Sequence, residues 1–314
     1  MNPLVQILKL SAWETTILIS CLCGCFFAGI SLAQLNEDSS IQDSLRYQKE
    51  RDQWMRSEDS PLALAGLFWL KPGENTLGTD PLNQIVLPAG SAPARVGRLQ
   101  LKAGQVRFES EQGVNVLFQG SRITARDLES DAAGSAPDVL SVGDLRIKII
   151  KRGDRQGLRL IYLRNPVLLD FHGLVFYQIN PAFRVIGKFS PYHPSKKIQI
   201  VNVLGQVEDM ECPGVVEFSL QGKSLRLEPV RESLDTDKLF FMFKDETNGK
   251  ETYEGGRYLY SNLPSLGGVI LDFNQAHNPY CAYTTYSTCQ IPPLQNWLKV
   301  SIPVGEKKYK RAIK

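Results

Sequence analysis

Residues 239–260 read LFFMFKDETNGKETYEGGRYLY and carry the clearest structural signal in the chain. Two runs rich in aromatic residues flank Asn248-Gly249, and Asn-Gly between such runs favours a type I′ turn. The sequence therefore predicts a β-hairpin with strands 239–246 and 251–260. Gly255 and Gly256 in the return strand predict a bulge or a close backbone approach, which would aim Arg257.

Short apolar runs bounded by Gly, Pro and Asn continue on both sides of this hairpin. Such runs, at intervals of about 8 to 12 residues, are typical of antiparallel sandwiches and barrels. We expect strands at 64–70, 84–87, 97–102, 105–110, 114–119, 142–151, 158–163, 174–179, 183–189, 197–203, 215–220, 223–229, 268–273 and 298–303. The fold class is therefore mainly β, with two antiparallel β-sandwich or barrel-like modules packed together, residues 61–155 and 156–309.

One amphipathic helix is expected before these strands, within residues 34–60. From Ser40 to Met55 a partial apolar stripe recurs at a spacing of three to four residues and contains Ile41, Leu45, Asp52 and Met55 with Tyr47 and Trp54. Glu, Lys and Arg fill the other positions. The pattern predicts a helix that packs its apolar stripe on a sheet.

The first 33 residues indicate a targeting segment. Thr15 to Ala33 carries no charge and ends in the small-x-small pattern Ser31-Leu32-Ala33, so we expect a signal peptide cleaved after Ala33. An uncleaved membrane anchor and a lipoprotein signal at Cys21 are the alternatives. All three place the remainder outside the cytoplasm, in the periplasm or the extracellular space. Contact with a membrane is expected only through this segment, if it stays uncleaved or is lipidated.

Composition narrows the classes of partner. The 314 residues include 36 basic and 33 acidic side chains, a formal net charge of +3, with 43% hydrophobic and 22% charged residues. This balance indicates a globular protein that does not bind nucleic acid. The chain has no Gly-x-Ser-x-Gly elbow, phosphate-binding loop or dinucleotide fingerprint, and we expect no cofactor.

Three cysteines follow the targeting segment: Cys212, Cys281 and Cys289. Cys281 and Cys289 lie eight positions apart in a turn-rich stretch and could form a disulfide in an oxidising compartment, with Cys212 buried and free. A metal site is disfavoured, because no Cys-x-x-Cys spacing occurs and the chain has only three histidines. No metal ligand is therefore assigned.

The first module resembles a forkhead-associated domain in the order of its strands. The resemblance rests on the segments 73–78, 83–88 and 142–145. Thr79 stands where that family has an arginine, and its Ser-x-x-His signature is missing from 93–99. We therefore take from this resemblance a sandwich shape and not the recognition of phosphothreonine.

A broader resemblance covers nearly all the chain after the targeting segment. The matching blocks are 66–70, 73–75, 159, 171–174, 243–247, 252–259, 272–274, 278–283, 289, 292–296 and 305–307. In this order they resemble the family called domain of unknown function 1684, whose activity is unassigned, so the resemblance implies no reaction. His277 stands where that family usually has Tyr, which counts against His277 as an indispensable base, and Gln290 replaces its usual Pro.

Polar residues that suit a binding site gather near the C-terminus. We predict ligand contacts from one cation, three carboxylates and two carboxamides: Arg257, Asp272, Asp245, Glu306, Asn274 and Asn278. Asp272 and Asn274 would share one face of a strand, and Arg257 could make a bidentate contact with a carboxylate, phosphate or sugar. The alternative is that these groups cap turns or form a buried structural network.

Two functions follow from this set. The first is an exported protein that binds a small anionic or sugar-like molecule in a polar pocket of the C-terminal module. The second is an extracytoplasmic hydrolase that uses the same pocket. Its catalytic candidates are Cys281 as a nucleophile with His277 as base, or Asp272 and His277 with Asp245 around a bound metal. The sequence does not decide whether the protein is an enzyme.

Overall fold

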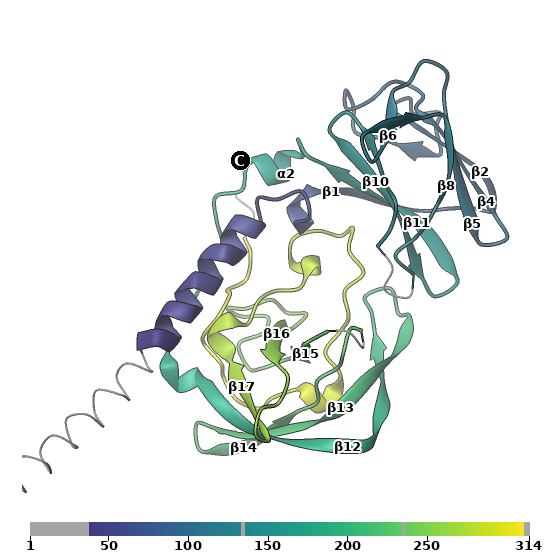
Figure 1. Cartoon of the computed structure of the whole chain (residues 1–314). Coiled ribbons are helices and arrows are strands. Elements are labelled where there is room, and N and C mark those ends of the chain that lie inside the picture. Colours follow the sequence, from purple (N-terminus) through teal and green to yellow (C-terminus); the bar gives the residue numbers. More distant parts are fainter. Residues whose placement is uncertain (1–37, 133–135, 234–235, 311–314) are drawn as a thin grey trace, which may run out of the picture.

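The computed structural model describes residues 38–132, 136–233 and 236–310. The predicted targeting segment, 1–33, lies outside them. The described chain is mainly β, as predicted, with several antiparallel sheets and one long N-terminal helix (Figure 1). Within these residues no helix is long and apolar enough to cross a membrane.

Two sheets form the first unit, which ends with β11. The five-stranded sheet has the order β3-β2-β4-β5-β8, in which only β2 and β3 are parallel. Its strands are β2 (Gly73–Gly78), β3 (Ile85–Val86), β4 (Gly97–Lys102), β5 (Gln105–Ser110) and β8 (Ala125–Leu128). The six-stranded sheet has the order β1-β11-β10-β9-β6-β7. Its strands are β1 (Leu64–Trp69), β6 (Val116–Phe118), β7 (Ser121–Ile123), β9 (Val139–Val142), β10 (Leu145–Arg152) and β11 (Arg155–Tyr162).

A single hydrophobic core lies between these two sheets. Leu99 and Phe108 enter it from the five-stranded sheet, and Ile147 and Leu160 from the six-stranded sheet, all fully buried. The first unit is therefore built as a sandwich. Strand β11 lies in the second module of the sequence-based division, yet it pairs with both β1 and β10, so the first unit extends to Tyr162.

The second unit begins at β12 and is built on two antiparallel sheets. A four-stranded sheet has the order β14-β13-β12-β17, and a two-stranded ribbon contains β15 and β16. The strands are β12 (Arg184–Val201), β13 (Val207–Leu220), β14 (Lys223–Leu227), β15 (Lys238–Phe243), β16 (Arg257–Asn262) and β17 (Gly268–Asp272). The strands predicted at 174–179 and 298–303 were wrong. The first segment makes only an isolated bridge, between Phe176 and Glu306, and no strand is assigned within the second.

The aromatic run of the opening stretch is buried on both faces of β15. Leu239, Phe241 and Phe243 join one core. Phe240 and Met242, on the opposite face, join a second core. Because side chains alternate along a strand, burial on both faces explains why this run is continuously apolar.

The predicted hairpin exists, but its turn was predicted wrongly. β15 and β16 pair from Lys238 opposite Asn262 to Phe243 opposite Arg257, so residues 244–256 form a long loop. Asn248 is not among the residues with positive φ, which a type I′ turn requires. Its side chain instead bonds the loop internally, accepting from the amide of Asp245 and donating to Tyr253 O. Gly256, at φ +99°, ends this loop and marks the predicted close approach, since an added Cβ would lie 2.6 Å from Pro292 Cγ.

The described part of the N-terminal helix spans 38–54, close to the predicted range. It lies against one flank of the second unit, with the first unit at the other end of the molecule (Figure 1). The predicted packing face is right in part, because Met55 is fully buried and Trp54 packs in the same hydrophobic cluster. It is wrong at Leu45, which is 46% exposed, whereas the polar Ser44 is buried. The short helices are η1 (Pro61–Ala63), α2 (Pro166–Leu169), η3 (Pro181–Phe183), η4 (Phe273–Gln275), η5 (Tyr280–Ala282) and η6 (Leu294–Asn296).

Candidate functional site

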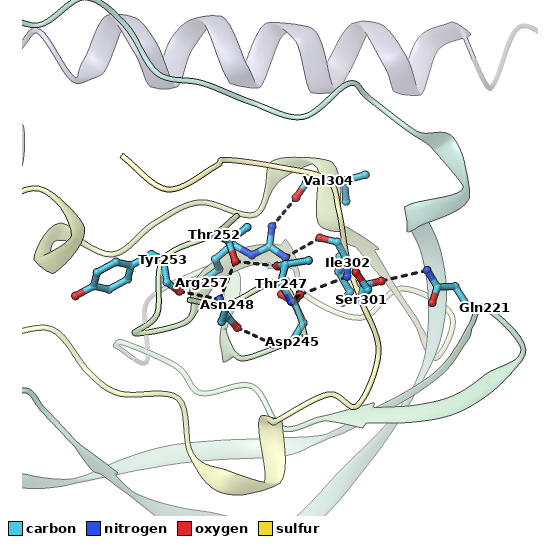
Figure 2. Close-up of polar contacts among 10 residues, drawn as sticks. All are labelled: Gln221, Asp245, Thr247, Asn248, Thr252, Tyr253, Arg257, Ser301, Ile302 and Val304. Carbon is cyan, nitrogen blue, oxygen red and sulfur yellow. Dashed lines mark hydrogen bonds and ion pairs between the residues drawn. The ribbon is translucent and has the colours of Figure 1, made fainter. Parts of the chain in front are cut away.

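Arg257, the predicted ligand-binding cation, is paired inside the protein. Its side chain is 0% exposed, and Nη2 lies 2.6 Å from Asp245 Oδ2, which is also fully buried. Nη1 donates to Val304 O and Nη2 to Ile302 O, so the guanidinium ties the hairpin to the segment 302–304 (Figure 2). The Arg257 side chain therefore has no exposed surface with which to make the predicted ligand contact in this structure.

Asp245 organises the loop beside this arginine. Its Oδ1 accepts from the amide and the hydroxyl of Thr247, at 2.8 Å and 2.6 Å, and from the amide of Ile302. Asp245 thus uses both oxygens within the protein. It does not join Asp272 and His277, and no group of three His, Cys, Asp or Glu side chains in the described ranges could hold a metal ion.

Asp272 and Asn274 form a second, separate network. Asp272 caps the short helix η4, and its Oδ1 accepts from the amide and the side-chain Nδ2 of Asn274. Oδ2 accepts from the hydroxyl of Ser44 on the N-terminal helix at 2.9 Å. Asp272 also lines a cavity of about 410 Å³ together with Arg184 and Tyr260. Arg184 Nε lies 3.9 Å from Asp272 Oδ2.

Glu306 and Asn278 meet in a third network, under the N-terminal helix. Glu306, 0% exposed, accepts from Asn278 Nδ2 at 2.9 Å and from the hydroxyl of Tyr283. Arg51 of the helix donates Nε to Glu306 and Nη2 to Asn278 O. Burial alone would lower the pKa of Arg51, but the adjacent Glu306 carboxylate raises that pKa above its ordinary value. The Arg51 guanidinium is therefore charged, and its buried contacts with Glu306 and Asn278 hold the helix.

His277 bonds to the same helix. Its Nδ1 lies 2.7 Å from the hydroxyl of Tyr47, and its ring stacks on Tyr260 with 5.9 Å between centroids. Burial, and then the nearby charge of Arg51, lower the pKa of His277 well below its ordinary value, so the ring is neutral at neutral pH. Among the described residues no contact joins His277 to Cys281, so the predicted nucleophile–base pair is not formed.

The N-terminal helix was missing from the predicted site. Ser44, Tyr47 and Arg51 lie three and four positions apart, so they share one helical face and reach three predicted site residues. The signal was a polar stripe at helical spacing. The apolar stripe, on which the helix was predicted, contains Tyr47 but neither Ser44 nor Arg51.

Cys281 and Cys289 are free thiols in this structure, not the predicted disulfide. They are nevertheless neighbours, because the amide of Cys281 lies 3.1 Å from Cys289 Sγ and Ser287 Oγ lies 3.0 Å from Cys281 Sγ. Hydrogen bonding with the Cys289 thiol, and then with Ser287, lowers the pKa of Cys281 to about 6. Cys212 is buried, as predicted, and burial raises the pKa of its thiol to about 11.

Cys281 also lines a cavity of about 700 Å³, which we call the Cys281 cavity. Residues 281–286 form one wall. The others are formed by Pro61, Leu62, Leu64, Ala65, Pro88, Ala89, Tyr162 and residues 164–167. Arg164 is exposed at this cavity and has no hydrogen-bond or ion-pair partner in the described parts of the chain. The Cys281 cavity thus combines a thiol of lowered pKa with an unpaired cation.

Solved structures are similar to parts of this chain. No curated protein matches the chain significantly. An uncharacterized protein of Haloarcula marismortui, solved by NMR, is 30% identical over 44% of this chain and 77% of its own, with a TM-score of 0.38. A chain from the complex of the FhaA FHA domain with the intracellular domain of Rv3910 is 12% identical over 30% of this chain and 96% of its own, with a TM-score of 0.22.

The sequence profile described as "Protein of unknown function (DUF1684)" matches residues 169–307. This segment contains all six predicted ligand contacts, from Asp245 to Glu306. It also contains the wall 281–286 of the Cys281 cavity. The N-terminal helix and Arg164 lie outside the matched segment. The chain belongs to the DUF1684 family.

Proposed function

We propose that this protein binds a small anionic or sugar-like molecule in the Cys281 cavity, outside the cytoplasm. The observation that carries the proposal is the unpaired, exposed Arg164 at a cavity of about 700 Å³. Cavities that hold small molecules in proteins measure about 300 to 1,000 Å³. The polar pocket predicted around Arg257 is thereby replaced by one between the two units.

The lining of the Cys281 cavity suits an anion with an organic body. Arg164 offers paired N–H donors that match a carboxylate or phosphate. Thr284 and Thr285 add hydroxyl groups, while Leu62 and Tyr162 supply apolar surface. Asn165 is not available, because its Nδ2 donates to Leu62 O and Leu64 O at 3.0 Å each.

A thermal-shift experiment tests this proposal. Citrate, a hexose phosphate and the corresponding neutral hexose are compared as probes with the wild type, Arg164→Gln and Arg226→Gln. Arg226 is a matched control, since it is an exposed arginine on β14 that does not line the Cys281 cavity. At ten times its Kd a ligand stabilises the protein by about 1.4 kcal/mol, enough to raise the melting temperature measurably.

We expect the anionic probes to stabilise the wild type and Arg226→Gln, and to lose this effect in Arg164→Gln. If the neutral hexose stabilises all three proteins equally, the ligand is sugar-like and Arg164 does not select it. Equal stabilisation of all three proteins by the anions, or none, would contradict anion binding in the Cys281 cavity.

Hydrolysis through Cys281 is the second candidate function. It is favoured by one observation, a thiol with a pKa of about 6 at the wall of the cavity. A thiolate is the nucleophilic form of cysteine, and at this pKa it needs no histidine to deprotonate it. The test is an acyl adduct at residue 281 after exposure to 4-nitrophenyl acetate, followed by its release. An adduct of equal yield in Cys281→Ser would contradict this function.

Export is supported by the uncharged stretch from Thr15 to Ala33. Fractionation of cells that produce the full chain, with sequencing of the mature N-terminus, tests both the compartment and the predicted cleavage after Ala33. A protein that stays in the cytoplasm with its first 33 residues intact would contradict the proposal.

A further inference from the structure

We propose that Cys281 and Cys289 form a thiol–disulfide exchange site whose substrate is a low-molecular-weight disulfide carrying carboxylates. This inference deepens the proposed function and rests on it, because the same cavity and the same Arg164 would hold the substrate. Three features carry it: the arrangement of the two sulfurs, their unequal access to the cavity, and the cation at that cavity.

The two sulfurs are arranged around one serine. Ser287 Oγ lies 3.0 Å from Cys281 Sγ and 3.6 Å from Cys289 Sγ, and the amide of Cys281 lies 3.1 Å from Cys289 Sγ. A hydroxyl placed in this way can donate a hydrogen bond to whichever sulfur is a thiolate. The neighbouring sulfurs can also reach each other without a large movement of the backbone, since they already share hydrogen-bond partners.

Access to the cavity separates the roles of the two cysteines. Cys281 is half-buried and lines the Cys281 cavity, whereas Cys289 is 8% exposed and does not line it. Only Cys281 can therefore meet a substrate in the cavity. Its lowered pKa supports the same assignment, because the thiolate is the attacking form.

The reaction balances within the site. The Cys281 thiolate attacks one sulfur of the substrate R–S–S–R, the substrate bond breaks, and one thiol R–SH leaves with a proton. Cys289 then attacks Cys281 Sγ of the mixed disulfide, and the second R–SH leaves. The substrate is reduced to two thiols while the two cysteines are oxidised to one disulfide, so no further oxidant is required.

Arg164 gives this site a preference for charge. Small biological disulfides that carry carboxylates present an anion to a guanidinium, which binds it through paired hydrogen bonds. An exchange site can be distinguished from a purely structural disulfide by whether its disulfide is reduced in the folded protein. A structural bond would form once and resist reduction in the folded protein, whereas this site would exchange in the native state.

The test follows each cysteine of the reduced full-length protein separately, by chymotryptic digestion after unfolding and peptide mass spectrometry. Oxidised glutathione is the anionic probe and bis(2-hydroxyethyl) disulfide the neutral one. We expect the wild type to form the 281–289 disulfide and to release two thiols. Cys289→Ser should stop at a mixed disulfide on residue 281, and Cys281→Ser should leave Cys289 unmodified. The buried Cys212 serves as an internal control in every sample.

The charge preference is tested with the same two probes. Arg164→Gln should slow oxidation by glutathione disulfide at least about threefold, the effect of one exposed charge pair. It should leave the rate with the neutral probe unchanged, and Arg226→Gln should change neither rate.

The exchange chemistry would be overturned by any of three results: no oxidation of the pair by either probe, modification of Cys289 in Cys281→Ser at the wild-type rate, or a native disulfide that reduces only after unfolding. Anion stabilisation without any oxidation would leave the proposed binding intact and reject the exchange chemistry. Oxidation by both probes at rates independent of Arg164 would reject the anionic substrate and the role of Arg164 in binding an anion. The wild-type kinetics at each cysteine decide the order of attack even if a variant fails to fold.

Discussion

Replacing Asp245 by Asn isolates the buried ion pair that holds the hairpin to the C-terminal segment. The asparagine keeps the volume of the side chain and the Oδ1 that accepts from Thr247. It replaces Oδ2 by an NH₂ group, so two donors face each other where Arg257 Nη2 now lies 2.6 Å from a carboxylate oxygen. Arg257 retains its two carbonyl partners but is left as a buried charge without a counter-ion.

Removing one partner of a buried ion pair costs about 3 to 5 kcal/mol. With a slope of about 3 kcal/mol per molar urea, the midpoint of unfolding should fall by about 1 to 2 M. Fluorescence of Trp54, Trp69 and Trp297 reports the transition. A matched control is Asp127→Asn, which breaks the exposed pair of Asp127 with Arg107 and should leave the midpoint unchanged. A midpoint for Asp245→Asn equal to that of the control would refute our reasoning that this pair stabilises the second unit.

Two further predictions concern the cysteine pair and the helix. The rate of alkylation of Cys281 by iodoacetamide should rise with pH up to about 6 and level off above it, because the thiolate reacts and hydrogen bonding with Cys289 lowers the pKa. Ser287→Ala should move this midpoint to higher pH, and an unchanged midpoint would remove Ser287 from the site. Arg51→Met leaves Glu306 buried without a counter-ion and should lower the free energy of unfolding in urea by about 3 kcal/mol or more. Arg46→Met, at an exposed position of the same helix, should leave it unchanged. Equal midpoints for the two helix variants would show that the buried pair does not hold the helix.

The parts of the fold that depend on local pattern could be predicted from the sequence. The apolar run 239–243 predicted a strand of a hairpin, and alternation elsewhere predicted the mainly β class. The turn was missed because Asn-Gly permits positive φ but does not impose it, and the side chain of Asn248 bonds the longer loop instead. The strand at 174–179 was predicted wrongly for a related reason, since an apolar run becomes a strand only where a partner strand pairs with it.

Proximity in the sequence also decided which site residues could be grouped correctly. Asp272 and Asn274 are two positions apart and do bond each other. The Arg51–Glu306 contact spans 255 positions, and no local pattern names such a partner. The numbers of charged residues do not show which arginine is buried, because a buried arginine and an exposed arginine are identical in sequence. For this reason the sequence could not show that Arg257 is buried and paired. Nor could it show that Arg164 is exposed at a cavity.

The helix and the Cys281 cavity are connected through Tyr283. Arg51 Nη2 lies 3.4 Å from the hydroxyl of Tyr283, which also donates to Glu306, while the same tyrosine lines the cavity. Since Tyr283 lies two positions after Cys281, the position of the cavity wall depends on a helix outside the family-matched segment. Arg51→Met should therefore disturb both the fold and the reactivity of Cys281, whereas Arg164→Gln should alter only the capture of an anion. The two variants thus separate support of the cavity wall from recognition of a ligand. Arg51 is paired with the buried carboxylate of Glu306, whereas Arg164 is exposed at the cavity.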